Sequence, residues 1–136
     1  MVRKSLTLAV RAVIARRSYK VLLLQRTDSR THGPGLWEVP GGMIQSGEPI
    51  VVALKREIKE ETGLIIYPRY AEPLTFVSPA SSEDRLVELI FRCKRVRGEK
   101  VKLSPEHQAF RWTTVEAALD LKLTPTAREL MEFLLE

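Results

Sequence analysis

Three glutamates lie close together near the middle of the chain. Glu57, Glu60 and Glu61 are spaced i, i+3 and i+4, so in a helix they share one face. Carboxylates on neighbouring turns repel one another and destabilise an isolated helix by roughly 0.2–0.5 kcal/mol per pair. A hard divalent cation such as Mg²⁺ prefers clustered oxygen ligands and would remove this repulsion. The spacing therefore predicts a metal-binding face.

Two charged residues and a glycine-rich loop accompany these glutamates. Arg56 precedes Glu60 by four residues, so its guanidinium can orient the carboxylates through forked hydrogen bonds. Glu48 lies before the helix, in a loop that contains Gly41, Gly42 and Gly47. Because glycine permits tight turns, this loop can fold back and direct Glu48 or a backbone carbonyl at the same metal.

The element that must hold the glutamates is a helix over residues 49–62. Val51, Leu54 and Ile58 form an apolar stripe with helical spacing, and the acidic residues are expected on the opposite side. Pro49 suits the first helical turn, and Gly63 is a natural residue to end the helix. The sequence predicts a rigid helix with one buried and one acidic face.

Apolar runs with turn residues between them predict the remaining elements. The chain has 136 residues, of which 44% are hydrophobic, and this length fits one domain over residues 1–136. The order of elements predicts an α/β protein with a mixed β-sheet covered by helices. Strands are expected at 6–14, 21–24, 36–39, 64–67, 74–77, 86–96 and 110–113, and further helices at 115–119 and 126–135.

Residues 42–64 resemble the signature of the Nudix hydrolases. The signature reads G-x5-E-x7-R-E-U-x-E-E-x-G-U, where U is aliphatic, and every fixed position is matched here. Residues 22–26 and 35–42 are similar to the strand and the entry loop of that family, as is, more loosely, the stretch from Glu106 to Trp112. The resemblance implies an α/β/α sandwich that hydrolyses a pyrophosphate bond in a nucleoside diphosphate linked to another group.

The resemblance also implies roles for individual residues. Glu60 and Glu61 would be the principal ligands of Mg²⁺ or Mn²⁺, and Glu57 a further ligand or the base that activates water. Glu106 is a second candidate for the base. Arg56 would orient the glutamates. The predicted metal ligands are the Gly41 carbonyl, Glu48, Glu57, Glu60 and Glu61, and the predicted catalytic residues are Arg56, Glu57, Glu60 and Glu106.

Two residues before the signature are candidates for substrate binding. Arg26 resembles a position that contacts the substrate phosphate, although a surface arginine at a strand end is an equally good interpretation. Trp37 could stack on a base, but an aromatic residue of the core is the more common case.

Several other residues favour ordinary structural roles. His32 and His107 could touch phosphate or serve as the base, whereas a polar surface position is the more frequent role of a loop histidine. Cys93, the sole cysteine, is expected to be a small buried hydrophobe. Phe76, Phe91 and Phe110 are expected in the core.

The sequence leaves the substrate open. Pro79 resembles a proline of the ADP-ribose pyrophosphatases, while the short chain is similar to family members that hydrolyse nucleoside triphosphates. An RNA 5′-end pyrophosphohydrolase and a non-catalytic nucleotide sensor are alternatives. A basic stretch, expected on an edge hairpin, could bind a polyanion, but no aromatic residues are interleaved with it. It comprises Arg92, Lys94, Arg95, Arg97, Lys100 and Lys102.

The charge balance is basic, with 22 lysines and arginines against 17 acidic residues. A net charge of +5 favours phosphate-bearing small molecules as partners, and nucleic acid only secondarily. Arg11 and Arg16 interrupt the apolar run near the N-terminus, and no run is long enough to span a membrane. We expect a cytoplasmic protein without membrane association. A homodimer is compatible with the resemblance.

Overall fold

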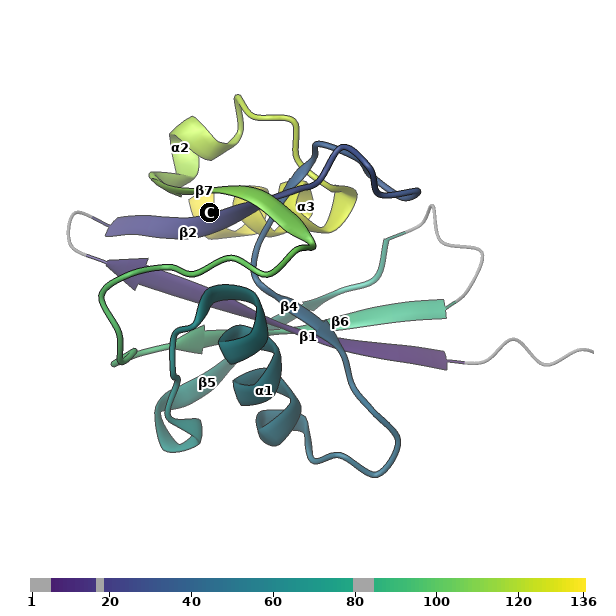
Figure 1. Ribbon diagram of the computed structural model, residues 1–136, viewed down its shortest axis with the longest axis vertical. Coiled ribbons are helices and arrows are strands. Elements are labelled where there is room, and N and C mark those ends of the chain that lie inside the picture. The colour runs from purple at the N-terminus through teal and green to yellow at the C-terminus, as the bar shows by residue number, and fades with distance from the viewer. Residues whose placement is uncertain (1–5, 17–18, 80–84) are drawn as a thin grey trace, which may run out of the picture.

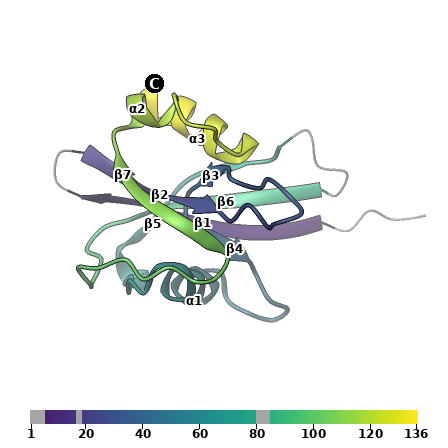
Figure 2. The same cartoon turned by 45° about the horizontal axis from the view of Figure 1, so that its top comes forward.

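A mixed β-sheet forms the middle layer of the molecule. The structure is a computed structural model, and it describes residues 6–16, 19–79 and 85–136. Helix α1 (Ile50–Thr62) covers one face of the sheet, while α2 (Val115–Ala118) and α3 (Pro125–Leu135) cover the other (Figures 1 and 2). The predicted α/β/α sandwich is confirmed. The strands are β1 (Leu6–Arg16), β2 (Lys20–Arg26), β3 (Trp37–Glu38), β4 (Gly41–Met43), β5 (Ala71–Val77), β6 (Arg85–Cys93) and β7 (His107–Thr113).

Strand β1 connects the two halves of this sheet. Residues 6–14 pair in parallel with β6, and Ala15 and Arg16 pair antiparallel with the start of β2. Strand β4 joins β1 antiparallel, and β5 pairs with β6 at the far border. On the other side, β2 pairs antiparallel with β3 and β7. The strands therefore diverge from β1, with α1 below one half and α3 above the other (Figure 1).

Alternating side chains of the strands supply a core on each face. In β1, Val10, Ala12 and Ile14 pack into the cluster that contains Leu54 and Ile58 of α1. Val13, between them in sequence, packs into the second cluster, with Leu130 and Met131 of α3. Successive strand residues point to opposite faces, so an almost continuous apolar run serves both layers. Burying each large apolar side chain contributes roughly 1.5–3 kcal/mol.

Helix α1 forms close to its predicted bounds. The helix begins at Ile50, so Pro49 takes the N-cap position instead of its predicted place in the first turn, and Gly63 is the C-cap. Gly63 has a φ of +74° and donates its N–H to the carbonyl of Lys59. The acidic residues do not all face solvent as expected, because Glu61 is buried. It lies against the loop that leads into β4 rather than on the outer side of the helix.

Three strand predictions need correction. Residues 64–67 are not a strand: Ile65 forms a single bridge with Arg97, and a 3₁₀ turn over Pro68–Tyr70 follows. Strand β6 ends at Cys93 instead of residue 96, and it lies between β1 and β5, so the basic stretch does not belong to an edge strand. Strand β4 was not predicted, because two of its three residues are glycines.

The aromatic predictions are partly wrong. Phe91 and Cys93 are buried as expected, whereas Phe76 is 68% and Phe110 is 43% exposed. Phe76 lies in the border strand β5, where its neighbour Val77 takes the inward side. Phe110 lies in β7, which pairs only with β2. None of the described helices is both long and apolar enough to cross a bilayer.

Candidate active site

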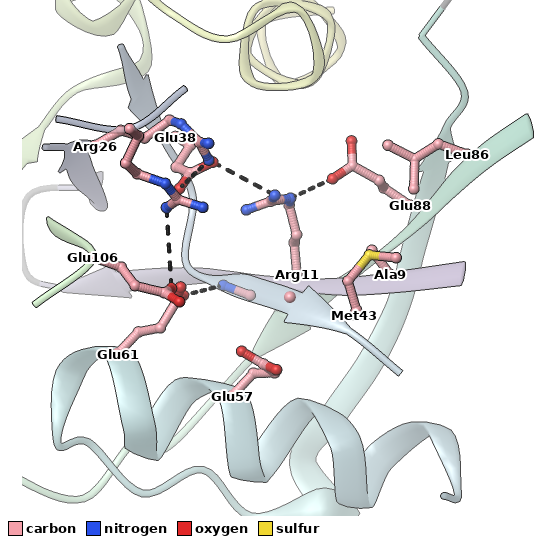
Figure 3. A pocket seen from close by; sticks show the side chains of 13 residues that line it. Ala9, Arg11, Arg26, Glu38, Met43, Glu57, Glu61, Leu86, Glu88 and Glu106 are labelled. Carbon is pink, nitrogen blue, oxygen red and sulfur yellow. Dashed lines mark hydrogen bonds and ion pairs between the residues drawn. The ribbon is translucent and has the colours of Figure 1, made fainter. Parts of the chain in front are cut away.

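A pocket of about 320 Å³ opens between α1 and strands β1, β4 and β6. Carboxylates of Glu57 and Glu61 rise from α1, and Glu106 joins them from the segment before β7 (Figure 3). Arginines reach the pocket from the opposite side, so acidic and basic side chains face one another across it. The pocket is lined by Ala9, Arg11, Arg26, Arg30, Glu38, Gly41, Gly42, Met43, Glu57, Glu61, Leu86, Glu88 and Glu106.

The two α1 carboxylates in the pocket are held in a poorly solvated place. Glu61 accepts a hydrogen bond of 2.7 Å from the backbone N–H of Gly41. Burial nevertheless raises the pKa of Glu61 to about 8. Burial also raises the pKa of Glu57, against the opposing effect of Arg56. Both groups are acids whose negative charge is incompletely balanced.

The backbone beside these carboxylates requires glycine at two positions. Gly41 has a φ of +152°, and a Cβ there would collide with the carbonyl oxygen of Val10. A Cβ at Gly42 would collide with the carboxylate of Glu57. The Gly41–Gly42 pair thus lets strand β4 approach both β1 and α1, which brings backbone groups to the acidic wall of the pocket.

Arg56 gathers the other acidic residues of the signature. Its Nε and Nη2 donate to the two carboxylate oxygens of Glu48, over 2.7 and 2.9 Å. Its Nη1 lies 2.8 Å from Oε1 of Glu57 and 3.3 Å from Oε2 of Glu60. Hydrogen bonds from Arg56 lower the pKa of Glu48 to about 2. The side chain of Glu60 is 58% exposed and does not line the pocket.

On the opposite wall, Glu38 is the centre of a buried charge network. Its carboxylate lies 3.2 Å from Arg26, 3.5 Å from Arg11 and 2.8 Å from Nε2 of His107. Although burial works in the opposite direction, the hydrogen bond from His107 and the two arginines lower the pKa of Glu38 to about 2. This carboxylate is therefore ionised, and it holds both arginines in place.

The network continues to α3 through a second buried carboxylate. Glu88 of β6 pairs with Arg11 and accepts a hydrogen bond from the hydroxyl of Thr126. Arg11 also donates to the Val39 carbonyl over 2.6 Å. Neither Glu88 nor the contacts of Arg11 were predicted as part of the site. A signal was present, because Arg11 and Glu88 each interrupt an apolar strand with a single charge of opposite sign.

The histidines and Trp37 occupy places that correct or decide the sequence predictions. The side chain of His107 is fully buried, so its predicted surface position is wrong. His32 is exposed, and its carbonyl accepts two hydrogen bonds from Arg26. Trp37 is buried in the core on the α3 side, which is the more common of the two roles considered for it, and it does not line the pocket. Its backbone pairs with Leu123, which fixes it there.

The acidic residues suit a hard divalent cation. In the described ranges no three His, Cys, Asp or Glu side chains are arranged to hold a metal ion. The reason is that Arg56 pairs with Glu48, Glu57 and Glu60, while the Gly41 N–H holds Glu61. The donors are all oxygens, and Glu61 lies in a buried place where a cation would offset the cost of its negative charge. Both features fit Mg²⁺ or Mn²⁺.

A second, less polar hollow continues from the acidic pocket toward α3. It has a volume of about 270 Å³ and shares Arg11, Arg26, Glu38, Leu86 and Glu88 with the first pocket. Leu36, Pro79 and Pro125 contribute apolar surface, and Thr124 and Thr126 contribute polar groups. Together the two hollows can accommodate a ligand with an anionic and a less polar part.

Comparison with known proteins places this fold and site in one family. The NUDIX domain model matches residues 5–134. The chain therefore belongs to the Nudix family, and it is a Nudix pyrophosphohydrolase.

Among its relatives, nucleoside triphosphatase NudI from Escherichia coli SE11 is 32% identical over 117 residues, which cover 79% of this chain and 82% of the relative. The crystal structure of the MutT protein from Methanosarcina mazei Go1 superposes with a TM-score of 0.85 at 27% identity, covering 98% of this chain and 95% of that one. The crystal structure of the MutT Nudix hydrolase from Burkholderia pseudomallei superposes with a TM-score of 0.82 at 28% identity, covering 95% of this chain and 98% of that one.

Proposed function

We propose that this enzyme hydrolyses a pyrophosphate bond of a nucleoside triphosphate, with Mg²⁺ or Mn²⁺, by attack of water at phosphorus. The observation that carries the proposal is the pocket itself, in which Glu57, Glu61 and Glu106 face Arg26 and Arg30. A polyphosphate needs cations on both sides, and here arginines supply one side while the acidic wall can hold a divalent cation. The name of the NudI relative supports a nucleoside triphosphate as the substrate.

The acidic residues divide into ligands and residues that hold them. Glu57, Glu60 and Glu61 would bind the cation together with the Gly41 carbonyl and Glu48. The chemistry that such a cation supplies when bound is neutralisation of phosphate charge and a lowered pKa of the attacking water. Arg56 keeps Glu48, Glu57 and Glu60 in orientation. Arg26, fixed by Glu38 and the His32 carbonyl, would face the phosphates.

Two carboxylates are candidates for the general base. Glu57 is half-buried, and burial raises its pKa, which favours its acceptance of a proton. Glu106 lines the same pocket with an exposed carboxylate, 4.0 Å from Arg30. Glu57→Gln and Glu106→Gln separate these roles, because the variant that lacks the base loses kcat and the pH dependence that the base causes.

The nucleoside would occupy the hollow that leads to α3. Its apolar walls, Leu36, Leu86 and Pro125, suit a base, and the buried carboxylate of Glu88 offers an acceptor for an amino or imino N–H. Glu88→Gln removes the charge but keeps the size of the side chain. We expect this variant to change the ranking of the four bases, which is read as the ratio of kcat/KM values.

The test is a screen of nucleoside triphosphates and other pyrophosphates in which the released products are identified. Turnover of triphosphates that requires Mg²⁺ or Mn²⁺ and is lost in Glu61→Gln supports the proposal. Turnover that is unchanged in Glu61→Gln would contradict the assignment of the metal ligands. Hydrolysis in ¹⁸O-labelled water identifies the phosphorus that is attacked, because the label enters one product only.

A nucleoside diphosphate sugar such as ADP-ribose is the second candidate. The observation in its favour is that Pro79, the residue that resembles the ADP-ribose pyrophosphatases, lines the hollow next to the phosphate pocket. The same screen decides between the two. A kcat/KM for ADP-ribose above that of every triphosphate would replace the first proposal.

A further inference from the structure

His107 lies between two carboxylates that belong to different walls of the pocket. It is the first residue of β7, and its side chain is fully buried. Nε2 lies 2.8 Å from Oε2 of Glu38, and Nδ1 lies 3.9 Å from Oε2 of Glu61. The imidazole thus links the buried charge network around Glu38 to the acidic wall of α1.

The Nδ1 atom of His107 has no hydrogen-bond partner. Among the described residues it is the sole buried side-chain nitrogen or oxygen in this condition. An unpaired buried polar atom destabilises the folded state, so its presence beside a carboxylate of the pocket calls for an explanation. The separation from Glu61 is too long for a hydrogen bond and short enough for a small shift of Glu61 to close it.

Both neighbours of the imidazole are fixed from their other sides. The guanidinium groups of Arg11 and Arg26 hold the carboxylate of Glu38. In the backbone, Arg26 of β2 lies opposite His107 of β7, next to an irregularity in the register at Gln25. The N–H of Gly41 holds Oε1 of Glu61, which leaves Oε2 facing His107. The carboxylate of Glu61 is therefore enclosed between a backbone amide and an imidazole that is itself anchored.

We infer that His107 is a positioning residue: anchored by Glu38, it directs Nδ1 at Glu61 and fixes the orientation in which that carboxylate meets the divalent cation. This inference rests on the proposed function, which assigns Glu61 to the cation. Outer partners of this kind determine how well a ligand is oriented, and their loss typically weakens metal affinity 10- to 100-fold.

Two conservative variants separate the two sides of the ring. Asparagine places its amide group near the position of Nδ1, and glutamine near that of Nε2. We expect His107→Gln to keep the link to Glu38 and to weaken Mn²⁺ binding by about 10- to 100-fold. His107→Asn is expected to bind Mn²⁺ about as tightly as the wild type, even though it loses the bond to Glu38 and is less stable. Free Mn²⁺ is measured by electron paramagnetic resonance on nucleotide-free protein.

The kinetic expectation for His107→Gln is a lower kcat at saturating nucleotide with an unchanged KM for the nucleotide. If the role of His107 were purely structural, His107→Gln and His107→Asn would both have a lower urea midpoint and would bind Mn²⁺ with equal affinity. That result would overturn the inference.

Glu61→Gln distinguishes this failure from a failure of the proposed function. If Glu61→Gln binds Mn²⁺ like the wild type, the assignment of Glu61 to the cation is wrong. If it loses affinity while His107→Gln does not, only the role of His107 is wrong. In the Glu61→Gln background, adding His107→Gln should weaken Mn²⁺ binding no further, because both changes act on one carboxylate. An additive loss would show that His107 acts by another route and would overturn the inference.

Discussion

The carboxylate of Glu57 occupies the place where a Cβ of residue 42 would lie, so β4 and α1 meet at Gly42 with no room for a side chain between them. The contact joins the first glycine of the Nudix signature to a glutamate fifteen residues later in the same signature. It gives a steric reason for glycine at this position, which is independent of backbone freedom.

We expect Gly42→Ala to lower kcat/KM by about 100-fold, because the added methyl group displaces Glu57 from its place in the pocket and misplacement of this size is costly. Gly47→Asn is the matched control. Residue 47 has a positive φ of 76°, which asparagine tolerates, and a Cβ there meets no atom within 4 Å. Steady-state kinetics and urea unfolding of both variants make the test, and equal losses of activity would refute the steric explanation.

Breaking the buried Arg11 network should destabilise the protein strongly. Arg11→Met removes the cationic partner of the buried Glu88, which is also one of the two arginines beside Glu38, and we expect the free energy of unfolding to fall by about 3–5 kcal/mol. Glu88→Gln keeps one acceptor oxygen, for either Arg11 or Thr126, and leaves no buried carboxylate without its arginine, so its loss should be smaller. Urea denaturation measures both. If Arg11→Met lost less free energy of unfolding than Glu88→Gln, the network would not be a stabilising unit.

The stability of the cation-free protein should fall as the pH rises above the ordinary pKa of a glutamate. Burial raises the pKa of Glu61 to about 8 from its ordinary value of 4.5, so folding takes up a proton when the pH lies between these two values. The stabilising contribution is complete below about pH 4.5 and is lost as the pH rises through about 8. We expect the urea midpoint in EDTA to decrease over this range, and addition of Mg²⁺ to restore it. Glu61→Gln should abolish the decrease.

Glu38 has the opposite effect at lower pH. Its pKa of about 2 in the folded protein lies below the ordinary glutamate value of 4.5, so its contribution to stability is present above about pH 4.5 and is lost as the pH falls toward 2. In Glu38→Gln the loss of stability in that acid range should be reduced. An unchanged acid transition in this variant would assign the transition to other carboxylates.

Cys93 should be unreactive in the native enzyme. Burial raises the pKa of its thiol to about 12, and it packs in the core shared with α1. A colorimetric disulfide reagent should therefore titrate no thiol in buffer, and one thiol per chain in denaturant. Rapid labelling under native conditions would show that this core opens readily.

The sequence was sufficient to predict the elements whose signals are local. Pro49, Gly63 and the apolar stripe defined α1 almost to the residue, because capping and helical spacing act within one turn. Strand β4 escaped prediction because Gly41 and Gly42 have no strand propensity and pair with β1 through tertiary structure. Residues 64–67 failed for the converse reason: their apolar pattern is that of a strand, but only Ile65 finds a partner.

The candidate site divides in the same way. Glu57, Glu61, Glu106 and Arg26 were predicted and do line one pocket, while their roles remain proposals. The burial of Glu61 and His107 was not predictable, since each is polar and becomes buried only when β4 and β7 close over α1. The partners of Arg11 were hidden because Glu88 lies far along the chain, and the two meet only through the parallel pairing of β1 and β6.

The parallel pairing of β1 and β6 also constrains when the enzyme can fold during its synthesis. Leu6 pairs with Arg85 and Ile14 with Cys93, so β1 is synthesised long before the strand with which it pairs in parallel. Closing so long a loop has a large entropic cost before any contact repays it, which slows folding. A ribosome-bound chain that ends before β6 would lack both Glu88 and the partner of β1. We therefore expect the enzyme to become active late in its synthesis, in a single step when the sheet is completed.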